Sequence, residues 1–236
     1  MKTLENKLIE ICDVDYLGQY KFQYLFSQFT QLATQSANEL GMWTIDMIDK
    51  YGWVLAKQTL IMNEPIMLGD MIDISTDVGK SSFVAFPRYY YIYKKQKEIG
   101  YCSSLWTLID IQKRNIVSPK KIGITIPNGH QQLPTPETIH SDIPLTFQTK
   151  RQVLYSDVDT NQHMNNARYI EWALDLLDFN MYRDYLIHEI SINYKKEMRP
   201  LEYVDLYLGH QDNVYIIEGK NDENTFFVIK IVFLEK

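Results

Sequence analysis

The sequence predicts an α+β protein with two similar units in one chain, each made of one helix followed by antiparallel strands. Three observations predict this class. Apolar residues recur at three- and four-residue steps in two separate stretches, runs rich in Val, Ile, Tyr and Thr follow each stretch, and a proline-rich segment divides the two sets. With 236 residues, 45% of them hydrophobic, the chain can bury one large core or two small ones.

Two helices are predicted from apolar stripes. The first ends at Gly41, where glycine suits the left-handed position that closes a helix, and its stripe consists of Phe22, Leu25, Phe26, Phe29, Leu32, Ala33 and Leu40. The second is entered through the polar run 161–166, which can cap it, and its stripe consists of Tyr169, Ile170, Ala173, Leu176 and Leu177. Each helix therefore has one face for a core.

Strands are predicted after each helix from β-branched and aromatic runs. In the first unit they cover 54–62, 71–78, 83–94 and 100–111, with turns at 68–70, 79–81 and 98–100. In the second unit they cover 189–195, 203–210, 213–220 and 226–234. We expect each long helix to lie across the concave face of its own curved antiparallel sheet.

The boundary between the units is predicted from prolines, which disfavour helix and remove backbone donors. Four of them occur close together: Pro127, Pro134, Pro136 and Pro144. We therefore expect a first domain at 1–130, a linker at 131–144 and a second domain at 145–236. The units also align loosely, with Asp15 on Asp159 (offset 144) and 69–73 on 201–205 (offset 132), so about twelve extra residues are expected near 42–53.

Composition and charge exclude several classes of protein. A net charge of -6 and a pI near 5.4 disfavour a nucleic-acid binder, which needs a basic face. The two cysteines, Cys12 and Cys102, suit neither a disulfide framework nor Cys-x-x-Cys chemistry. Charges interrupt every short apolar run at the N-terminus, so we expect neither a signal peptide nor a membrane span. A cytoplasmic location is expected.

The densest chemistry lies just before the second helix. Asp159, Asn161 and His163 place a carboxylate, an amide and an imidazole at alternate positions. Alternate side chains converge in an extended or turn-like loop and splay on a helix, so a loop is predicted here. The aligned positions of the first unit hold Leu17 and Gln19, so only the second unit has this cluster.

Helix capping explains this polar run as well as catalysis does, because Asp and Asn cap helices routinely. A calcium loop matches at its first three ligand positions but fails at Gln162, where glycine is needed, and at Arg168, where glutamate is needed. The sequence has no Gly-x-Ser-x-Gly elbow, phosphate-binding loop or zinc spacing. No metal or cofactor is expected. Activation of water by His163 together with a carboxylate remains as the candidate chemistry.

The run 157–172 resembles, almost position by position, the signature of the acyl-acyl carrier protein (ACP) thioesterases. The segment 192–198, downstream of His163, resembles the strand of that family that carries a catalytic glutamate, here Glu197. Residues 53–59, 68–73 and 104–110 look like strands of its first domain. The resemblance implies two tandem hot-dog domains. Because the first domain lacks the polar cluster, we expect it to form the acyl-chain pocket.

The same resemblance implies that the chain hydrolyses fatty acyl-ACP without a cofactor. It assigns catalysis to Asp159, Asn161, His163 and Glu197. The family often has Cys after this glutamate, and here that position is Met198, whose thioether cannot attack as a thiolate. We therefore expect attack by a water held by Glu197 and His163, with backbone N–H groups near Asn165 and Asn166 stabilising the oxyanion.

The expected partner is an acidic acyl carrier protein, and assembly as a homodimer is compatible with this plan. Basic clusters that could steer the carrier are Lys195, Lys196 and Arg199, or Lys120 and Lys121. Candidates for the acyl pocket are Phe22, Leu25, Phe26, Phe29, Trp43 and Met47. Two alternatives stay open: a hot-dog thioesterase that acts on acyl-coenzyme A, and a hot-dog protein that binds acyl groups without catalysis.

Overall fold

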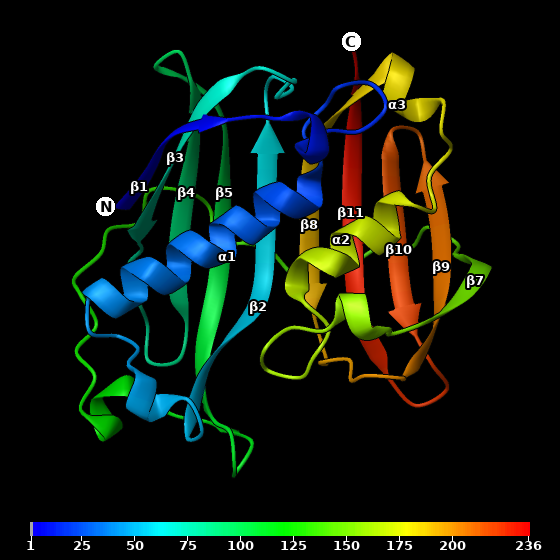
Figure 1. Cartoon of the computed structure of the whole chain (residues 1–236). Coiled ribbons are helices and arrows are strands. Elements are labelled where there is room, and N and C mark those ends of the chain that lie inside the picture. Colours follow the sequence, from blue (N-terminus) through cyan, green and yellow to red (C-terminus); the bar gives the residue numbers. More distant parts are fainter. Residues whose placement is uncertain (1) are drawn as a thin grey trace.

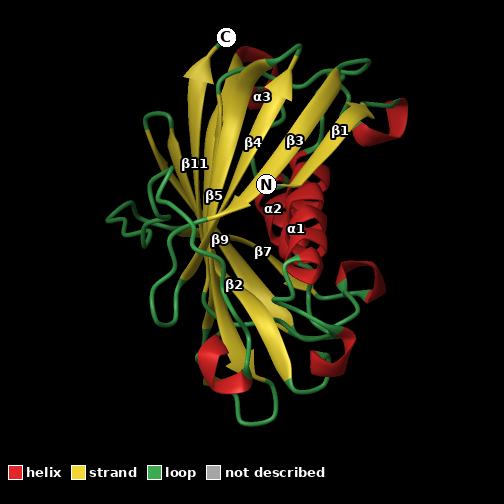
Figure 2. Cartoon of the chain, turned by 90° about the vertical axis from the view of Figure 1, so that its left-hand side faces the viewer, coloured by secondary structure: helices red, strands yellow, loops and turns green. Residues whose placement is uncertain are grey.

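The computed structural model describes residues 2–236, which form one continuous antiparallel sheet around two helices (Figures 1 and 2). The strand order is β1-β3-β4-β5-β2-β8-β11-β10-β9-β7, with the short β6 paired to β5. The first half contains β1 (Lys2–Leu8), β2 (Tyr51–Met62), β3 (Met71–Val78), β4 (Phe86–Lys94), β5 (Lys97–Asp110) and β6 (Asn115–Ile116). The second half contains β7 (Thr146–Gln152), β8 (Tyr185–Tyr194), β9 (Tyr203–Gln211), β10 (Val214–Lys220) and β11 (Thr225–Glu235).

The two halves of the sheet meet where β2 pairs with β8. Lys57 pairs with Asn193 and Ile61 pairs with Glu189, so positions related by the offset of 132 exchange places across the seam. Thr59 lies directly opposite its own counterpart, Ser191, and their hydroxyl oxygens are 2.9 Å apart. The halves are therefore related by an approximate two-fold axis that passes between these two side chains.

Both helices lie on the concave face of the sheet, which curves around them (Figure 2). α1 (Phe22–Glu39) buries Leu25, Phe26 and Phe29, and the centroid of the Phe29 ring lies 4.6 Å from that of Tyr90 on β4. α2 (Asn166–Leu174) packs its apolar face into the same core, which is continuous through both halves. This shared core implies that the halves stabilise each other.

The predicted fold class is confirmed: the protein is α+β, with two hot-dog units in tandem. Two strands were missed, and some local predictions were wrong. Each unit has a strand before its helix, β1 or β7, which the apolar pattern did not indicate. The turn expected at 98–100 lies at Lys95–Gln96, and β4 begins at Phe86 instead of 83.

The second helix is also shorter than predicted. α2 has 9 residues and α1 has 18, so α1 is nine residues longer (18 - 9). Most of the twelve additional residues of the first half therefore extend its helix, and only the remainder lies in the segment near 42–53. A four-residue helix, α3 (Met181–Asp184), completes the connection from α2 to β8.

Between Ile122 and Thr146 the chain has neither helix nor strand and crosses the convex face of the sheet, opposite the helices (Figure 2). It is fixed at the seam, where the Asn193 side chain donates to the carbonyl oxygen of Glu137 (3.0 Å) and accepts from the N–H of Ile139 (2.7 Å). Lys57 donates to Thr138 from the neighbouring strand. Within residues 2–236 no helix is both long and apolar enough to cross a membrane.

Candidate active site

The predicted cluster lies in a tight turn, as its spacing indicated. The N–H of Asp159 donates to the carbonyl oxygen of His163 (2.9 Å), and the N–H of Gln162 donates to that of Asp159 (3.0 Å). The Asp159 carboxylate accepts the backbone N–H of Asn161 at 2.8 Å. Asp159 therefore uses its side chain to build the turn that carries the other two residues.

The buried Asp157 fixes this turn to the start of α2. Its carboxylate accepts the N–H of Leu154 (2.9 Å) and the Nε–H of Arg168 (3.0 Å), and its carbonyl oxygen accepts the N–H of Asn165 (2.8 Å). These contacts use the carboxylate that the calcium-loop alternative would assign to a metal. In the part of the chain that the structure describes, no three His, Cys, Asp or Glu side chains are grouped to hold a metal ion.

The helix is capped by Asn165, whose side chain accepts the N–H of Ala167 at 2.9 Å. Asp159, Asn161 and His163 therefore do not cap the helix, and capping does not explain their presence. Because the Asn165 N–H is already bonded to Asp157, it is not a free oxyanion donor, contrary to the expectation above. Asn166, the first residue of the helix, remains a candidate for that role.

Glu197 reaches the turn from the segment that follows β8. The N–H of Met164 donates to the carbonyl oxygen of Met198 (2.8 Å), which joins this segment to the turn. The N–H of Met198 in turn donates to the hydroxyl of Tyr169 on α2 (3.2 Å). Burial raises the pKa of Tyr169, so its hydroxyl stays neutral at ordinary pH.

These contacts bring His163 and Glu197 together. The Nε2 atom of His163 lies 3.5 Å from the Oε2 atom of Glu197, and the side chains are 24% and 39% exposed. The imidazole and the carboxylate are thus adjacent, partly shielded and still open to solvent. This arrangement suits transfer of a proton to or from a bound water.

Asn161 lies on the same turn, exposed, and no hydrogen bond joins its side chain to His163 or Glu197 in the described chain. Met198 is fully buried in the core. The thioether therefore packs away from the polar pair, in agreement with its lack of a nucleophilic role.

Two residues near this pair were not identified from the sequence. Tyr169 was assigned only to an apolar stripe, although its hydroxyl supports the backbone beside Glu197. Arg114 belongs to the other half of the chain, yet its Nη1 atom is 3.8 Å from Glu197 Oε2. Nothing in the spacing of either residue indicated these contacts.

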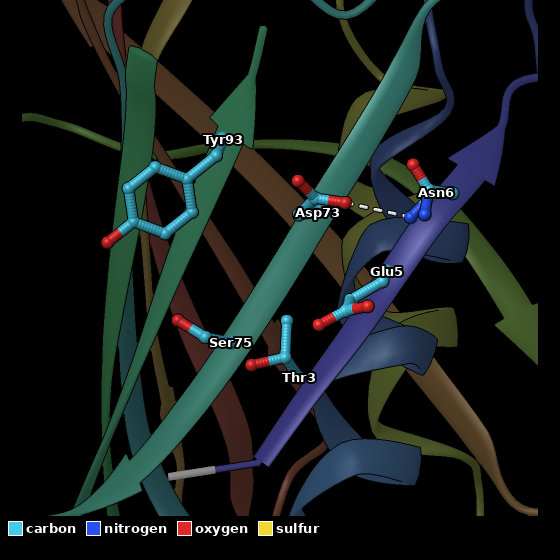
Figure 3. A pocket seen from close by; sticks show the side chains of 6 residues that line it. All are labelled: Thr3, Glu5, Asn6, Asp73, Ser75 and Tyr93. Carbon is cyan, nitrogen blue, oxygen red and sulfur yellow. Dashed lines mark hydrogen bonds between the residues drawn. The ribbon is translucent and has the colours of Figure 1, made fainter. Parts of the chain in front are cut away.

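The candidate residues for an acyl pocket are divided between two apolar clusters. Leu25, Phe26 and Phe29 belong to the main core, whereas Trp43 and Met47 pack against a small second cluster beyond the C-terminal end of α1. Two surface hollows lie elsewhere. One, of about 290 Å³, is polar and shallow at the β1–β3 edge, where the N–H of Asn6 donates to Asp73 (2.7 Å; Figure 3). The other, of about 520 Å³, lies beside α3 and β11, and neither contains a predicted site residue.

Comparison with known proteins gives matches along both halves. The model of the acyl-ACP thioesterase N-terminal domain matches residues 2–121, and the model of the C-terminal domain matches residues 141–228. The acyl-[acyl-carrier-protein] hydrolase FATB2 of Cuphea viscosissima, a chloroplastic protein, is 24% identical over 156 residues. The match covers 61% of this chain and 38% of the plant protein, so the chain spans well under half of that relative's length.

Solved structures show the same fold along the whole chain. An acyl-ACP thioesterase from Bacteroides thetaiotaomicron superposes with a TM-score of 0.86 at 24% identity, covering 99% of this chain and 97% of that one. The 12:0-ACP thioesterase from Umbellularia californica gives a TM-score of 0.81 at 14% identity, with coverage of 100% and 96%. Since domain models of one family match both halves, the chain belongs to the acyl-acyl carrier protein thioesterase family.

Proposed function

We propose that this protein hydrolyses the thioester of fatty acyl-ACP, and that His163 and Glu197 activate the attacking water. The observation that carries the proposal is the 3.5 Å approach of these two side chains, in a chain of the acyl-ACP thioesterase family. Similarity to proteins named acyl-ACP hydrolases and thioesterases supports a substrate in which the acyl group is attached to acyl carrier protein.

In the proposed reaction, a water bound between the pair loses a proton to one of the two groups. Its oxygen attacks the thioester carbonyl carbon and forms a tetrahedral intermediate. Collapse of this intermediate breaks the C–S bond, and the stored proton passes to the leaving sulfur, so the products are a fatty acid and a free thiol. No covalent intermediate with the protein is needed, which agrees with Met198 at the position after Glu197.

The oxyanion is assigned to donors at the start of α2. The N–H of Asn166 lies at the positive end of the helix dipole, and the exposed amide of Asn161 is free to turn toward the substrate or the water. Asp159 acts indirectly, since its carboxylate holds the turn through the N–H of Asn161. Removal of one oxyanion donor typically lowers a rate about a hundredfold.

We assign the acyl chain to the first domain, 1–130, and the chemistry to the second, 145–236, with the linker at 131–144 between them. The concave face of the first half supports this division because it is apolar beneath α1, where Phe29 meets Tyr90. The acidic carrier would dock near the exposed Lys195, Lys196 and Arg199, which flank Glu197 in the same segment.

The test is release of free thiol from a panel of acyl-ACP substrates of increasing chain length. His163→Gln and Glu197→Gln each remove the proton-transfer group and keep a polar side chain of similar size. We expect kcat/KM to fall about a hundredfold or more in each variant, with an unchanged melting temperature. His130→Gln and Glu223→Gln, at exposed positions, are the matched controls and should behave as wild type.

Wild-type turnover by either site variant would exclude the proposed pair. The same acyl chains on coenzyme A separate the first alternative, because faster hydrolysis of those thioesters would reassign the carrier. Saturable binding of acyl-ACP without thiol release would instead identify an acyl-binding protein. Met198→Leu, which replaces the thioether with a hydrocarbon side chain of similar volume at a buried site, should retain most of the activity.

A further inference from the structure

The turn that connects β5 to β6 brings a cation from the first half to the proposed site in the second half. Nη1 of Arg114 lies 3.8 Å from Oε2 of Glu197, the same oxygen that lies 3.5 Å from Nε2 of His163. In Figure 1 this turn follows β5 at the lower end of the sheet, and β8 runs toward the same end. One carboxylate oxygen therefore faces two basic groups from different halves.

The two basic residues of this turn, Lys113 and Arg114, contact different partners. Lys113 is held locally, since its N–H donates to Asp110 (2.8 Å) and its Nζ atom lies 3.6 Å from the same carboxylate. Arg114 has a left-handed backbone (φ 49°), which costs a non-glycine residue on the order of 1 kcal/mol. The antiparallel pairing of β5 with β6 fixes the turn, and only Arg114 points across to Glu197.

Stability alone does not explain this contact. The Arg114 side chain is 60% exposed, and an exposed ion pair typically contributes about 0–1 kcal/mol to the free energy of unfolding. The useful property of Arg114 is instead that its charge does not change. Whichever of His163 and Glu197 takes the proton in the proposed reaction, the attraction between these two groups changes, whereas the guanidinium stays charged throughout.

We propose that Arg114 is a positioning residue that keeps the Glu197 carboxylate beside His163 during turnover. This inference rests on the proposed function and adds that the first half contributes a residue to the site. A competing role for the same cation is direct attraction of the acidic carrier protein, and the two roles differ in what they change. Positioning affects the chemical step, whereas attraction affects binding and depends on salt.

The kinetic test compares Arg114→Gln, Arg114→Lys and the control Lys113→Gln, which removes a charge from the same turn. We expect Arg114→Gln to lower kcat about tenfold with KM within twofold of wild type, because a displaced catalytic group slows the reaction without weakening binding. Arg114→Lys keeps the charge and should recover part of the loss. Lys113→Gln should leave both constants unchanged.

A crystal structure of Arg114→Gln gives a readout that does not depend on activity. We expect the Glu197 carboxylate to turn away from His163, beyond the 3.5 Å separation seen with Arg114 present. An unmoved carboxylate would overturn the inference, as would a salt-dependent rise in KM at constant kcat. If the wild-type protein releases no thiol, the proposed function fails, and the crystal structure still decides whether Arg114 positions Glu197.

Discussion

The turn at 13–20 in the first half and the turn at 157–164 in the second share one backbone conformation. In the first, the N–H of Asp15 donates to Gln19 O (2.8 Å), that of Gly18 to Asp15 O (3.0 Å) and that of Leu17 to the Asp15 carboxylate (2.8 Å). The second turn has the same three bonds at the aligned positions. A backbone hydrogen bond then joins each turn to the segment that follows a strand, from Tyr20 to Ile66 after β2 and from Met164 to Met198 after β8 (2.8 Å in both).

None of three proposed site residues of the second half is matched at the aligned position of the first half. Where the second half has Asn161, His163 and Glu197, the first has Leu17, Gln19 and Pro65 (offsets 144 and 132). The aspartate of the turn occurs in both halves, so the fold needs it whether or not a polar pair is present. The comparison therefore assigns Asp159 a structural task and leaves the proposed chemistry to the other three residues.

The largest difference between the turns is expected at the aspartate that anchors each of them. Asp157 is buried and ion-paired with Arg168 at 3.0 Å, whereas Asp13 is more exposed and lies 3.3 Å from Lys7. Asp157→Ala removes the acceptor of two hydrogen bonds, from the Leu154 N–H and the Arg168 guanidinium, and should lower the free energy of unfolding by about 3 kcal/mol, although Arg168 keeps its ion pair with Glu171. Asp13→Ala should cost about 1 kcal/mol. Urea denaturation measures both, and equal losses would contradict this ranking.

The next effect concerns Tyr169, whose counterpart in the first half is Leu25 (offset 144). Tyr169→Phe leaves the buried N–H of Met198 without an acceptor and should cost about 1–2 kcal/mol in urea denaturation. We also expect a lower kcat, because Glu197 precedes Met198. Tyr20→Phe is the control: its buried hydroxyl has no partner among the described residues, so its loss should leave stability unchanged or higher.

A smaller effect is expected when the turn carboxylates are removed. Asp15 accepts two backbone N–H groups, from Leu17 (2.8 Å) and Gln19 (2.9 Å), and Asp159 accepts one. Asp15→Ala should therefore lower stability by about 1.5 kcal/mol and Asp159→Ala by about 1 kcal/mol. Only Asp159→Ala should reduce thiol release. Equal loss of activity in both variants would argue against a site confined to the second half.

The smallest effect concerns the left-handed position of each turn, Gly18 (φ 74°) in the first and Gln162 (φ 63°) in the second. Gln162→Gly should raise the free energy of unfolding by about 0.5 kcal/mol, since glycine relieves the backbone strain but loses more entropy on folding. Gly18→Gln should lower it by about 1 kcal/mol. A new Cβ at Gly18 meets only an ordinary contact with Leu68 (3.9 Å), so this loss would not come from a steric clash of the Cβ atom.

Sequence periodicity was a good guide to the elements that face the core. Strands such as β11 and the apolar stripe of α1 were predicted because burial of one face imposes a regular spacing. β1 and β7 were missed because they are the two ends of the sheet and are largely exposed, so their residues follow no apolar alternation. Edge strands are specified by their neighbours more than by their own sequence.

The site was only partly accessible from the sequence. The loop containing His163 was predicted from alternate polar residues, whereas Glu197 required resemblance to a family, because a carboxylate so far from the loop in sequence carries no local signal. Arg114 could not be predicted, since its approach depends on the β5–β6 turn and on the packing of one half against the other. The structural use of Asp159 was also hidden, because spacing does not reveal a bond to the backbone.

The covalent connection across the convex face has a consequence for how the two halves can vary. In a symmetric dimer of identical subunits, each substitution occurs twice, so a change that suits one copy of a turn is imposed on the other. Here residues 123–145 join two halves that are encoded separately, and they keep each half at a high effective concentration for the other. Gln19 and Pro65 can therefore coexist with His163 and Glu197 in one molecule. Because of this connection, a substitution can change one half of a nearly symmetric fold and leave the other half as it was.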